Sequence, residues 1–161
     1  MPCRILTRSR LVSRVYKSCI ADSSRSISAS VYKFSEKHVF EALKAKVQEA
    51  PGIRVRLLMN DGTLDDENAQ WLQELQKMGS KSVEVRLWKE VKDENFQKLH
   101  SKITLCDGTA VVGSANWSKS SCQENMELVV ILRDAASVGT LEKLFQTLWD
   151  DVHAQPMLMP Q

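Results

Sequence analysis

Four polar side chains in one stretch of the sequence have the types and spacing for phosphoryl chemistry. His100 and Lys102 are separated by one residue, and Ser114 and Asn116 follow in the segment Gly113–Asn116. Alternate residues of a β-strand share a face, so we expect His100 and Lys102 to project to the same side. The imidazole and the ammonium group would then act on one bound molecule.

The residues between the two pairs predict a hairpin that brings the pairs together. Asp107-Gly108 separates two strand-like segments, 99–105 and 109–112, and an Asp-Gly pair favours a tight turn. The second strand would return beside the first and carry the serine and the asparagine towards the histidine. Ile103 and Leu105 would face the other way, into a layer of helices.

This set of side chains suits a phosphodiester. The lysine supplies a positive charge to the phosphoryl oxygens, and the serine and asparagine donate hydrogen bonds to them. A histidine can attack phosphorus and form a covalent phosphohistidine. The segment holds no carboxylate cluster for a metal ion, so we expect no metal and no cofactor.

The segment resembles the H-x-K-(x)4-D-(x)n-G-S-x-N signature of the phospholipase D superfamily. The similarity extends from about residue 26 through the closing helix. It is greatest to the small members with one motif, namely bacterial endonucleases and mitochondrial cardiolipin hydrolase. One residue fewer than usual separates Asp107 from Gly113, and we expect the tight turn to absorb the difference.

The resemblance implies a set of catalytic residues, His100, Lys102, Asp107 and Glu127, and the substrate-binding residues Ser114 and Asn116. Trp117 is added to the substrate-binding residues because it directly follows Asn116. The resemblance implies that His100 is the nucleophile and that Lys102, Ser114 and Asn116 bind the phosphoryl group. Asp107 is a turn residue of the signature rather than a reacting group. Glu127 orients the imidazole of His100, with Glu124 as a less favoured substitute. Trp117 either lines the substrate cleft or a dimer seam, or is a core aromatic residue.

One motif is not enough for hydrolysis through a phosphohistidine, because a second group must protonate the leaving alkoxide. In the superfamily a second histidine does this. His38 and His153 are not followed by lysine two residues later, and we expect both at the surface. A homodimer that brings two copies of His100 to one shared site would complete the machinery.

The elements around the motif alternate between strand and helix. The pattern predicts further strands over 28–34, 53–59, 82–88 and 127–132, and helices over 36–50 (with Ser35 as the N-cap), 64–78 and 135–152. A polar loop is expected over 89–98. This order predicts a single α/β domain, a phospholipase D-like mixed sheet with helices on both faces.

The first 25 residues are basic, with six Lys or Arg against one Asp. They predict a targeting leader of the mitochondrial kind that runs into a first helix over 9–21, or that helix alone; apolar periodicity favours the helix. The catalytic domain is expected over 26–154 and a frayed tail over 155–161. With no secretory signal and no apolar run near the ~20 residues of a membrane span, we expect a mitochondrial or cytoplasmic location.

The four cysteines, Cys3, Cys19, Cys106 and Cys122, include no C-x-x-C pair, and we expect free thiols. Cys106 and Cys122 flank the motif; buried, inert thiols are favoured over redox control.

The functional prediction is a metal-independent phosphodiesterase that acts through a covalent phosphohistidine. The favoured substrates are phospholipids of the cardiolipin type, hydrolysed to phosphatidic acid. The alternative is an endonuclease for single-stranded nucleic acid, which is weakened because the residues after 25 carry a net charge of −3. A second alternative is a non-catalytic binding module on the same fold.

Overall fold

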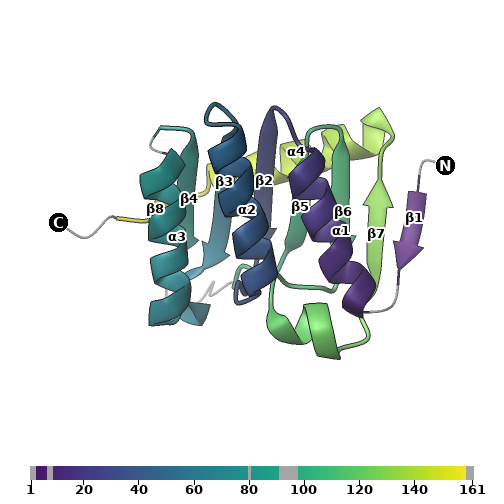
Figure 1. Ribbon diagram of the computed structural model, residues 1–161, viewed down its shortest axis with the longest axis horizontal. Helices are drawn as coiled ribbons and strands as arrows, with labels where there is room; N and C mark the ends of the chain where they lie inside the picture. The colour runs from purple at the N-terminus through teal and green to yellow at the C-terminus, as the bar shows by residue number, and fades with distance from the viewer. Residues whose placement is uncertain (1–2, 7–8, 80, 91–97, 159–161) are drawn as a thin grey trace.

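A mixed β-sheet passes through the middle of the protein (Figure 1). The structure is a computed structural model that describes residues 3–6, 9–79, 81–90 and 98–158. The strands in these residues are β1 Cys3–Leu6, β2 Ser26–Val31, β3 Arg54–Asn60, β4 Val83–Trp88, β5 Lys102–Cys106, β6 Thr109–Gly113, β7 Val129–Leu132 and β8 Ala154–Pro156. They lie in the order β1-β7-β6-β5-β2-β3-β4-β8 across the sheet.

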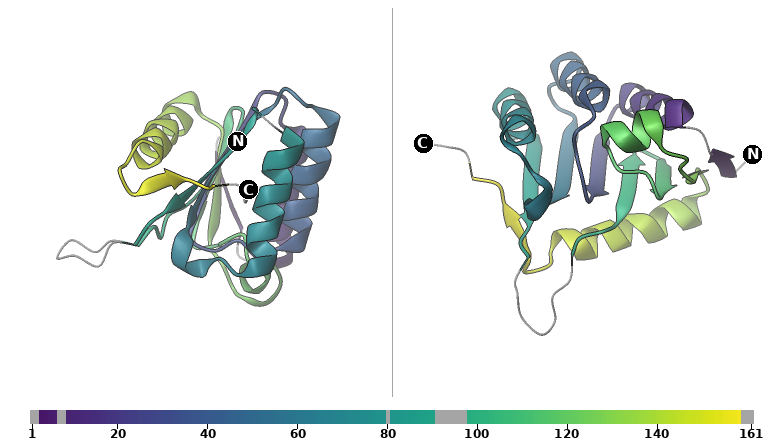
Figure 2. Two further views of the ribbon diagram at one scale, coloured as in Figure 1. Left: turned by 90° about the vertical axis from the view of Figure 1, so that its left-hand side faces the viewer. Right: turned by 90° about the horizontal axis from the view of Figure 1, so that it is seen from below.

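Helices cover both faces of this sheet (Figure 2). Helices α1 Ser9–Asp22, α2 Lys37–Glu49 and α3 Asp66–Gly79 pack on one face, and α4 Ala135–Trp149 lies across the other. Two short helices, η1 Asp61–Thr63 and η2 Ser120–Glu124, lie in connections. The predicted single α/β domain with a mixed sheet is therefore confirmed, as is the first helix. No helix in the described ranges combines the length and apolar character needed to cross a membrane.

Strands β2, β3 and β4 are parallel, because each is joined to the next by a helix that crosses the sheet. In β2 every residue after the first is buried, and in β3 the last four residues are buried. Apart from Asn60, these buried residues are apolar or small, as expected for strands covered on both faces. Parallel strands end at the same edge of a sheet. The residues that follow β2 therefore leave the sheet at the edge where β3 and β4 also end.

Strands β5, β6 and β7 run antiparallel and continue the sheet on the other side of β2. The pair Cys106↔Thr109 closes the β5–β6 hairpin, so Asp107-Gly108 is a two-residue turn as predicted. Asp107 adopts the left-handed conformation (φ 48°), which aspartate tolerates better than most residues. Ile103, the second residue of β5, pairs with Val112, and the same register places Lys102 opposite Gly113. The short spacing is accommodated inside the hairpin.

The structure adds two edge strands that the sequence prediction lacked. Strand β1 pairs with β7, and β8 pairs with β4 through Trp88↔Ala154. Gln155 and Pro156 therefore belong to the sheet, whereas the prediction placed them in a frayed tail; residues 159–161 lie outside the described residues. Strands this short contain too few residues to show an alternating pattern.

Two predicted boundaries near the motif also move. Glu36, not Ser35, caps α2, because its side chain accepts a hydrogen bond from the His38 amide (3.2 Å). Strand β5 begins at Lys102 rather than at residue 99, so His100 lies just before the strand. Most of the predicted 89–98 loop, residues 91–97, lies outside the described residues.

The carboxylate of Asp107 joins the hairpin turn to the start of β2. It accepts hydrogen bonds from the amides of Ser24 (2.8 Å), Arg25 (3.1 Å) and Ser26 (2.9 Å), and from the Ser24 hydroxyl (3.1 Å). Burial by itself raises the pKa of this carboxyl, but the three amides and the hydroxyl together hold the pKa below its ordinary value. This geometry supports the structural role expected for Asp107.

We predict that Asp107→Asn lowers the free energy of unfolding by about 1–2 kcal/mol at neutral pH, because the charged acceptor is lost. The folded-state pKa is depressed, so the contribution is complete above about pH 5 and is lost as the pH falls through the folded-state pKa. Urea titrations between pH 3 and 7, chosen to bracket the ~3.9 pKa of a free aspartate, measure this. The exposed Asp66→Asn is the matched control, with an expected change within about 0.5 kcal/mol. Parallel pH curves for Asp107→Asn and the wild type would contradict the prediction.

Candidate active site

His100 and Lys102 lie together where β5 meets the end of β2. The Lys102 ammonium is 3.1 Å from His100 Nδ1 and donates to the His100 carbonyl oxygen at 2.7 Å. Tyr32, the residue after β2, packs its ring against the imidazole with the centroids 4.9 Å apart, and its ring centre is 5.6 Å from Lys102 Nζ. His100 is exposed and Lys102 is partly exposed, so both are accessible to a molecule in solvent.

Ser114 and Glu127 form a second hydrogen-bonded group. The Ser114 hydroxyl donates to the Glu127 carboxylate and accepts from the Leu128 amide at 3.0 Å. Asn125 also donates to this carboxylate, at 3.4 Å, and Glu127 is only 8% exposed. In this single chain the carboxylate thus contacts Ser114 and Asn125 rather than His100. Its expected role in orienting the imidazole stays a prediction.

Asn116 is held by the segment that follows β2. Its side-chain oxygen accepts a hydrogen bond from the backbone amide of Lys33 at 3.2 Å, and its backbone amide donates to the Ser121 hydroxyl at 3.2 Å. Tyr32 and Lys33 therefore contact the two halves of the motif, one on His100 and the other on Asn116. The structure brings His100, Lys102, Ser114, Asn116 and Glu127 to one edge of the sheet, the edge seen from below in the right panel of Figure 2. Asp107 lies at the opposite end of β5, at the start of β2.

The structure corrects the assignment of Trp117 to substrate binding. Its side chain is 0% exposed, so it is a core residue, which was the other reading of the sequence. The indole Nε1 donates to the Thr104 hydroxyl at 3.1 Å, and the ring packs edge-on against Tyr16 and Phe34. A buried indole that finds a hydrogen-bond acceptor is a stable core element.

The backbone of Trp117 fixes the motif to α2. Its carbonyl oxygen accepts from the amides of Ser35 (2.7 Å) and Glu36 (3.0 Å), and the buried Glu36 carboxylate accepts from Gln123 at 2.9 Å. Sequence reasoning missed Tyr32, Glu36 and Gln123. Tyr32 carried a signal, because it is an aromatic residue at the end of a strand, but the contact between Glu36 and Gln123 joins residues 87 apart.

The electrostatics of the site centre on Lys102 and Glu127. Partial burial lowers the pKa of Lys102, and the negative charge of Glu127 opposes that shift. The ammonium group is therefore less hydrated than that of a surface lysine. An anion can replace His100 as its hydrogen-bond partner. Among the described residues, no group of three or more His, Cys, Asp or Glu is arranged to hold a metal ion.

In the described part of the chain, neither of the other two histidines forms a hydrogen bond or a ring contact with His100 or Lys102. His153 stacks on Trp88 and pairs with Asp151 at 2.7 Å. Trp88 ends β4, three strands from β5, which corresponds to about 14 Å at ordinary strand spacing. His38 is exposed in the first turn of α2. The described part of the chain therefore presents one histidine, His100, next to Lys102.

The fold and the residues at this edge define a phospholipase D-like domain. The family model described as "Cardiolipin synthase, PLD-like domain" matches residues 16–149, and the chain belongs to this family.

Curated relatives align with most of this chain. The mitochondrial cardiolipin hydrolase of Xenopus laevis is 28% identical over 130 residues, which cover 80% of this chain and 57% of that protein. The mitochondrial cardiolipin hydrolase of Mus musculus is 26% identical over 151 residues, which cover 93% of this chain and 63% of that protein. The chain thus spans about three-fifths of the length of these relatives.

Solved structures share the fold over almost the whole chain. NucT from Helicobacter pylori has a TM-score of 0.80 at 18% identity and covers 96% of this chain and 98% of its own. Nuc from Salmonella typhimurium, described as a phospholipase D family member, has a TM-score of 0.78 at 18% identity, with 98% and 99% covered. At this identity the likeness shows a common fold.

We predict that Gly113→Ala destabilises the protein by roughly 2–4 kcal/mol. Gly113 has φ 156°, and a Cβ there would collide with the carbonyl oxygen of Leu128, which accepts the Ser114 amide. Gly139→Ala is the matched control, because a Cβ at this position in α4 meets nothing within 4 Å. That variant is expected to gain about 0.5–1 kcal/mol from helix propensity. Equal urea midpoints for the two variants would rule out the collision.

Proposed function

We propose that the protein is a phosphodiesterase that acts through a covalent phosphohistidine at His100. The observation that carries the proposal is the exposed His100–Lys102 pair, 3.1 Å apart, at the same edge as Ser114 and Asn116. These groups supply a nucleophile, a cation and hydrogen-bond donors, which is what displacement at phosphorus requires when no metal takes part.

The contact between Lys102 and His100 suggests how substrate binding activates the nucleophile. An ammonium group only donates, so Nδ1 accepts from it, and the neutral imidazole then carries its proton on Nε2. Phosphoryl oxygens bind the ammonium more strongly than a neutral imidazole does. We expect a bound diester to break the hydrogen bond from Lys102 to Nδ1. A carboxylate such as Glu127 can then accept a hydrogen bond from a protonated Nδ1, which leaves Nε2 unprotonated and able to attack.

In the proposed reaction Nε2 forms a bond to phosphorus and the leaving alkoxide takes a proton from a general acid. Water then attacks the phosphohistidine, gives its proton to the same group, and releases the phosphomonoester and His100. The general acid in this scheme is His100 of a second copy of the chain. The single histidine beside Lys102 supports this homodimer, since two copies related by a twofold axis bring identical segments together.

Phospholipids of the cardiolipin type are the substrates that we propose. Two apolar side chains, Met126 (78% exposed) and Leu128 (52% exposed), flank Glu127 at the rim of the site. An apolar rim beside a phosphate site suits a diester embedded in a lipid surface. The curated relatives named mitochondrial cardiolipin hydrolase support the same substrate class and a mitochondrial location.

A single-stranded nucleic acid is the second candidate substrate. Lys33 and Lys119 are exposed and lie close to Asn116. The backbone amide of Lys33 donates a hydrogen bond to the Asn116 side chain, and Lys119 follows Asn116 by three residues in the sequence. Such cations would follow a phosphate backbone. A non-catalytic binding module is the third possibility, which a phosphoenzyme would exclude.

We predict that His100→Ala abolishes turnover in EDTA without changing the fold, because the nucleophile is lost. The assay offers cardiolipin vesicles and a labelled single-stranded oligonucleotide in parallel, and the wild type is expected to release phosphatidic acid from the vesicles. His38→Ala is the control, since this histidine is exposed and outside the cluster, and its activity should match the wild type. Retained turnover in His100→Ala would discard the mechanism, and cleavage of the oligonucleotide alone would make the protein a nuclease.

The shared site predicts a particular result for mixed dimers. A heterodimer of wild type and His100→Ala, isolated with two different tags, should be inactive, because its one site holds a nucleophile or an acid but never both. A heterodimer of wild type and His38→Ala should keep full activity. Half-maximal activity in the first heterodimer would mean that each chain works alone.

A further inference from the structure

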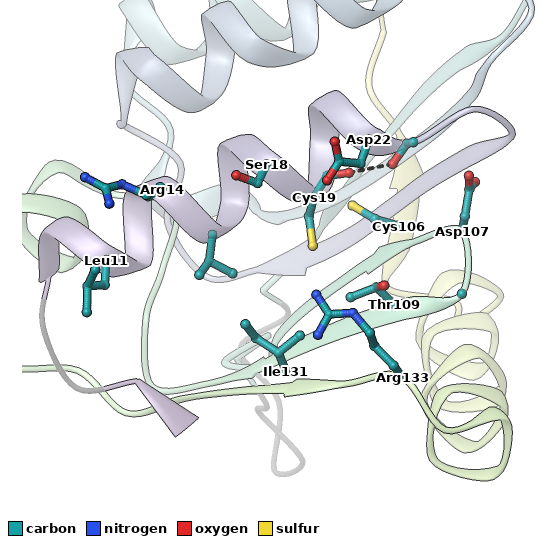
Figure 3. Close-up of a pocket in the computed structure, with 13 residues that line it drawn as sticks. Leu11, Arg14, Ser18, Cys19, Asp22, Cys106, Asp107, Thr109, Ile131 and Arg133 are labelled. Atoms are coloured by element: carbon teal, nitrogen blue, oxygen red, sulfur yellow. Dashed lines mark hydrogen bonds between the residues drawn. The ribbon is translucent and has the colours of Figure 1, made fainter. Parts of the chain in front are cut away.

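An open cavity of about 650 Å³ lies between α1 and the sheet and extends along α1 to the Asp107-Gly108 turn. Figure 3 shows it between α1 and the strands β5, β6 and β7, next to the Asp107-Gly108 turn. Its wall combines apolar side chains such as Ile131 with the arginines Arg14 and Arg133 and two cysteines. The catalytic proposal uses none of these side chains except the turn residue.

The two cysteines, Cys19 of α1 and Cys106 of β5, are neighbours across this cavity. Their sulfur atoms lie in the space between the helix and the strand, and the guanidinium group of Arg133 approaches Cys19 from the opposite wall (Figure 3). Cys19 is partly exposed to the cavity, whereas Cys106 is buried behind it. Both are free thiols in the structure.

The environment distinguishes the two sulfurs chemically. The pKa of Cys19 is lowered, first by its interaction with the Cys106 thiol and also by the positive charge of Arg133, although partial burial opposes these effects. The pKa of Cys106 is raised by its interaction with Cys19 and by burial. A partly exposed thiol next to an arginine thus stands beside a second, buried thiol. Oxidation-sensitive cysteine pairs have this arrangement.

We propose that Cys19 and Cys106 form an oxidation-sensitive dithiol, in which Cys19 reacts with a peroxide entering the cavity and Cys106 resolves the product as a disulfide. This departs from the inert role that the sequence predicted for Cys106. It also gives a function to a cavity that the phosphodiesterase proposal does not use.

The chemistry balances with hydrogen peroxide as the oxidant. The Cys19 thiolate attacks one peroxide oxygen, the O–O bond breaks, and the products are a Cys19 sulfenic acid and hydroxide. The Cys106 sulfur then attacks the Cys19 sulfur, the S–O bond breaks, and water leaves as the disulfide forms. Both thiol protons end in water, and the two electrons lost by the sulfurs reduce the peroxide.

The cross-link would tie α1 to β5 and close a loop of about half of the chain. Such a link stabilises mainly by restricting the unfolded chain. We therefore expect the oxidised protein to melt several degrees above the reduced protein, and dithiothreitol to reverse the shift.

The experiment treats the full-length wild-type protein with hydrogen peroxide and maps its cysteines by non-reducing peptide mass spectrometry. We expect a peptide that links Cys19 to Cys106, lighter by two hydrogen atoms than the reduced pair. In the reduced protein, alkylation of Cys19 should be at least roughly tenfold faster than that of the buried Cys122. A link from Cys19 to Cys3 or Cys122, or no link while peroxide oxidises other residues, would overturn the proposal.

Two variants sharpen the result. Cys106→Ala removes the resolving thiol, so peroxide should leave a Cys19 sulfenic acid that dimedone captures. Cys122→Ser is the matched control and should still form the link. The wild-type map decides the question even if Cys106→Ala fails to fold. The readout is sulfur chemistry, so the outcome is independent of the proposed phosphodiesterase activity.

Discussion

The burial of Trp117 is the constraint on which the site depends. The chain leaves β6 at the edge of the sheet and would otherwise continue into solvent, carrying Ser114 and Asn116 with it. Instead the indole of Trp117 packs between Tyr16 and Phe34 in the core. The backbone carbonyl oxygen of Trp117 accepts hydrogen bonds from the amides just before α2. At Trp117, three residues past Ser114 and one past Asn116, the backbone is thus anchored in the core. The functional side chains sit on a short segment with a fixed end.

The same arrangement explains why the site combines rigidity with exposure. Tyr16 donates from α1 to the carbonyl of Ala115, the residue between Ser114 and Asn116, at 2.9 Å. Tyr32 and Lys33 support the motif from the side of β2. The backbone is therefore held from three elements, while the reactive atoms of His100 and Lys102 face outward. A site open on one side suits chemistry that a second molecule completes.

The parts of this structure that sequence reasoning could predict are those encoded locally. The hairpin follows from Asp107-Gly108 between two apolar segments, and the helices follow from apolar periodicity. The convergence of His100, Lys102, Ser114 and Asn116 needed only the hairpin. Contacts between distant segments were missed, because no local pattern encodes them: the bond from Gln123 to Glu36 and the support of His100 by Tyr32 depend on how α2, η2 and β2 meet. Trp117 was ambiguous for the same reason, since burial is decided by the partners around a residue.

The N-terminal segment has a consequence for maturation by proteolysis. The basic segment before position 26 resembles a cleavable targeting sequence. In the fold, however, this segment includes β1, which pairs with the edge of β7, and α1, whose Val12 and Ile20 are fully buried. Cutting after residue 25 would uncover the apolar edge strand β7 and a large area of core, and exposed strand edges of this kind invite aggregation. The folded domain therefore depends on this segment, which closes one edge of the sheet and supplies part of the core.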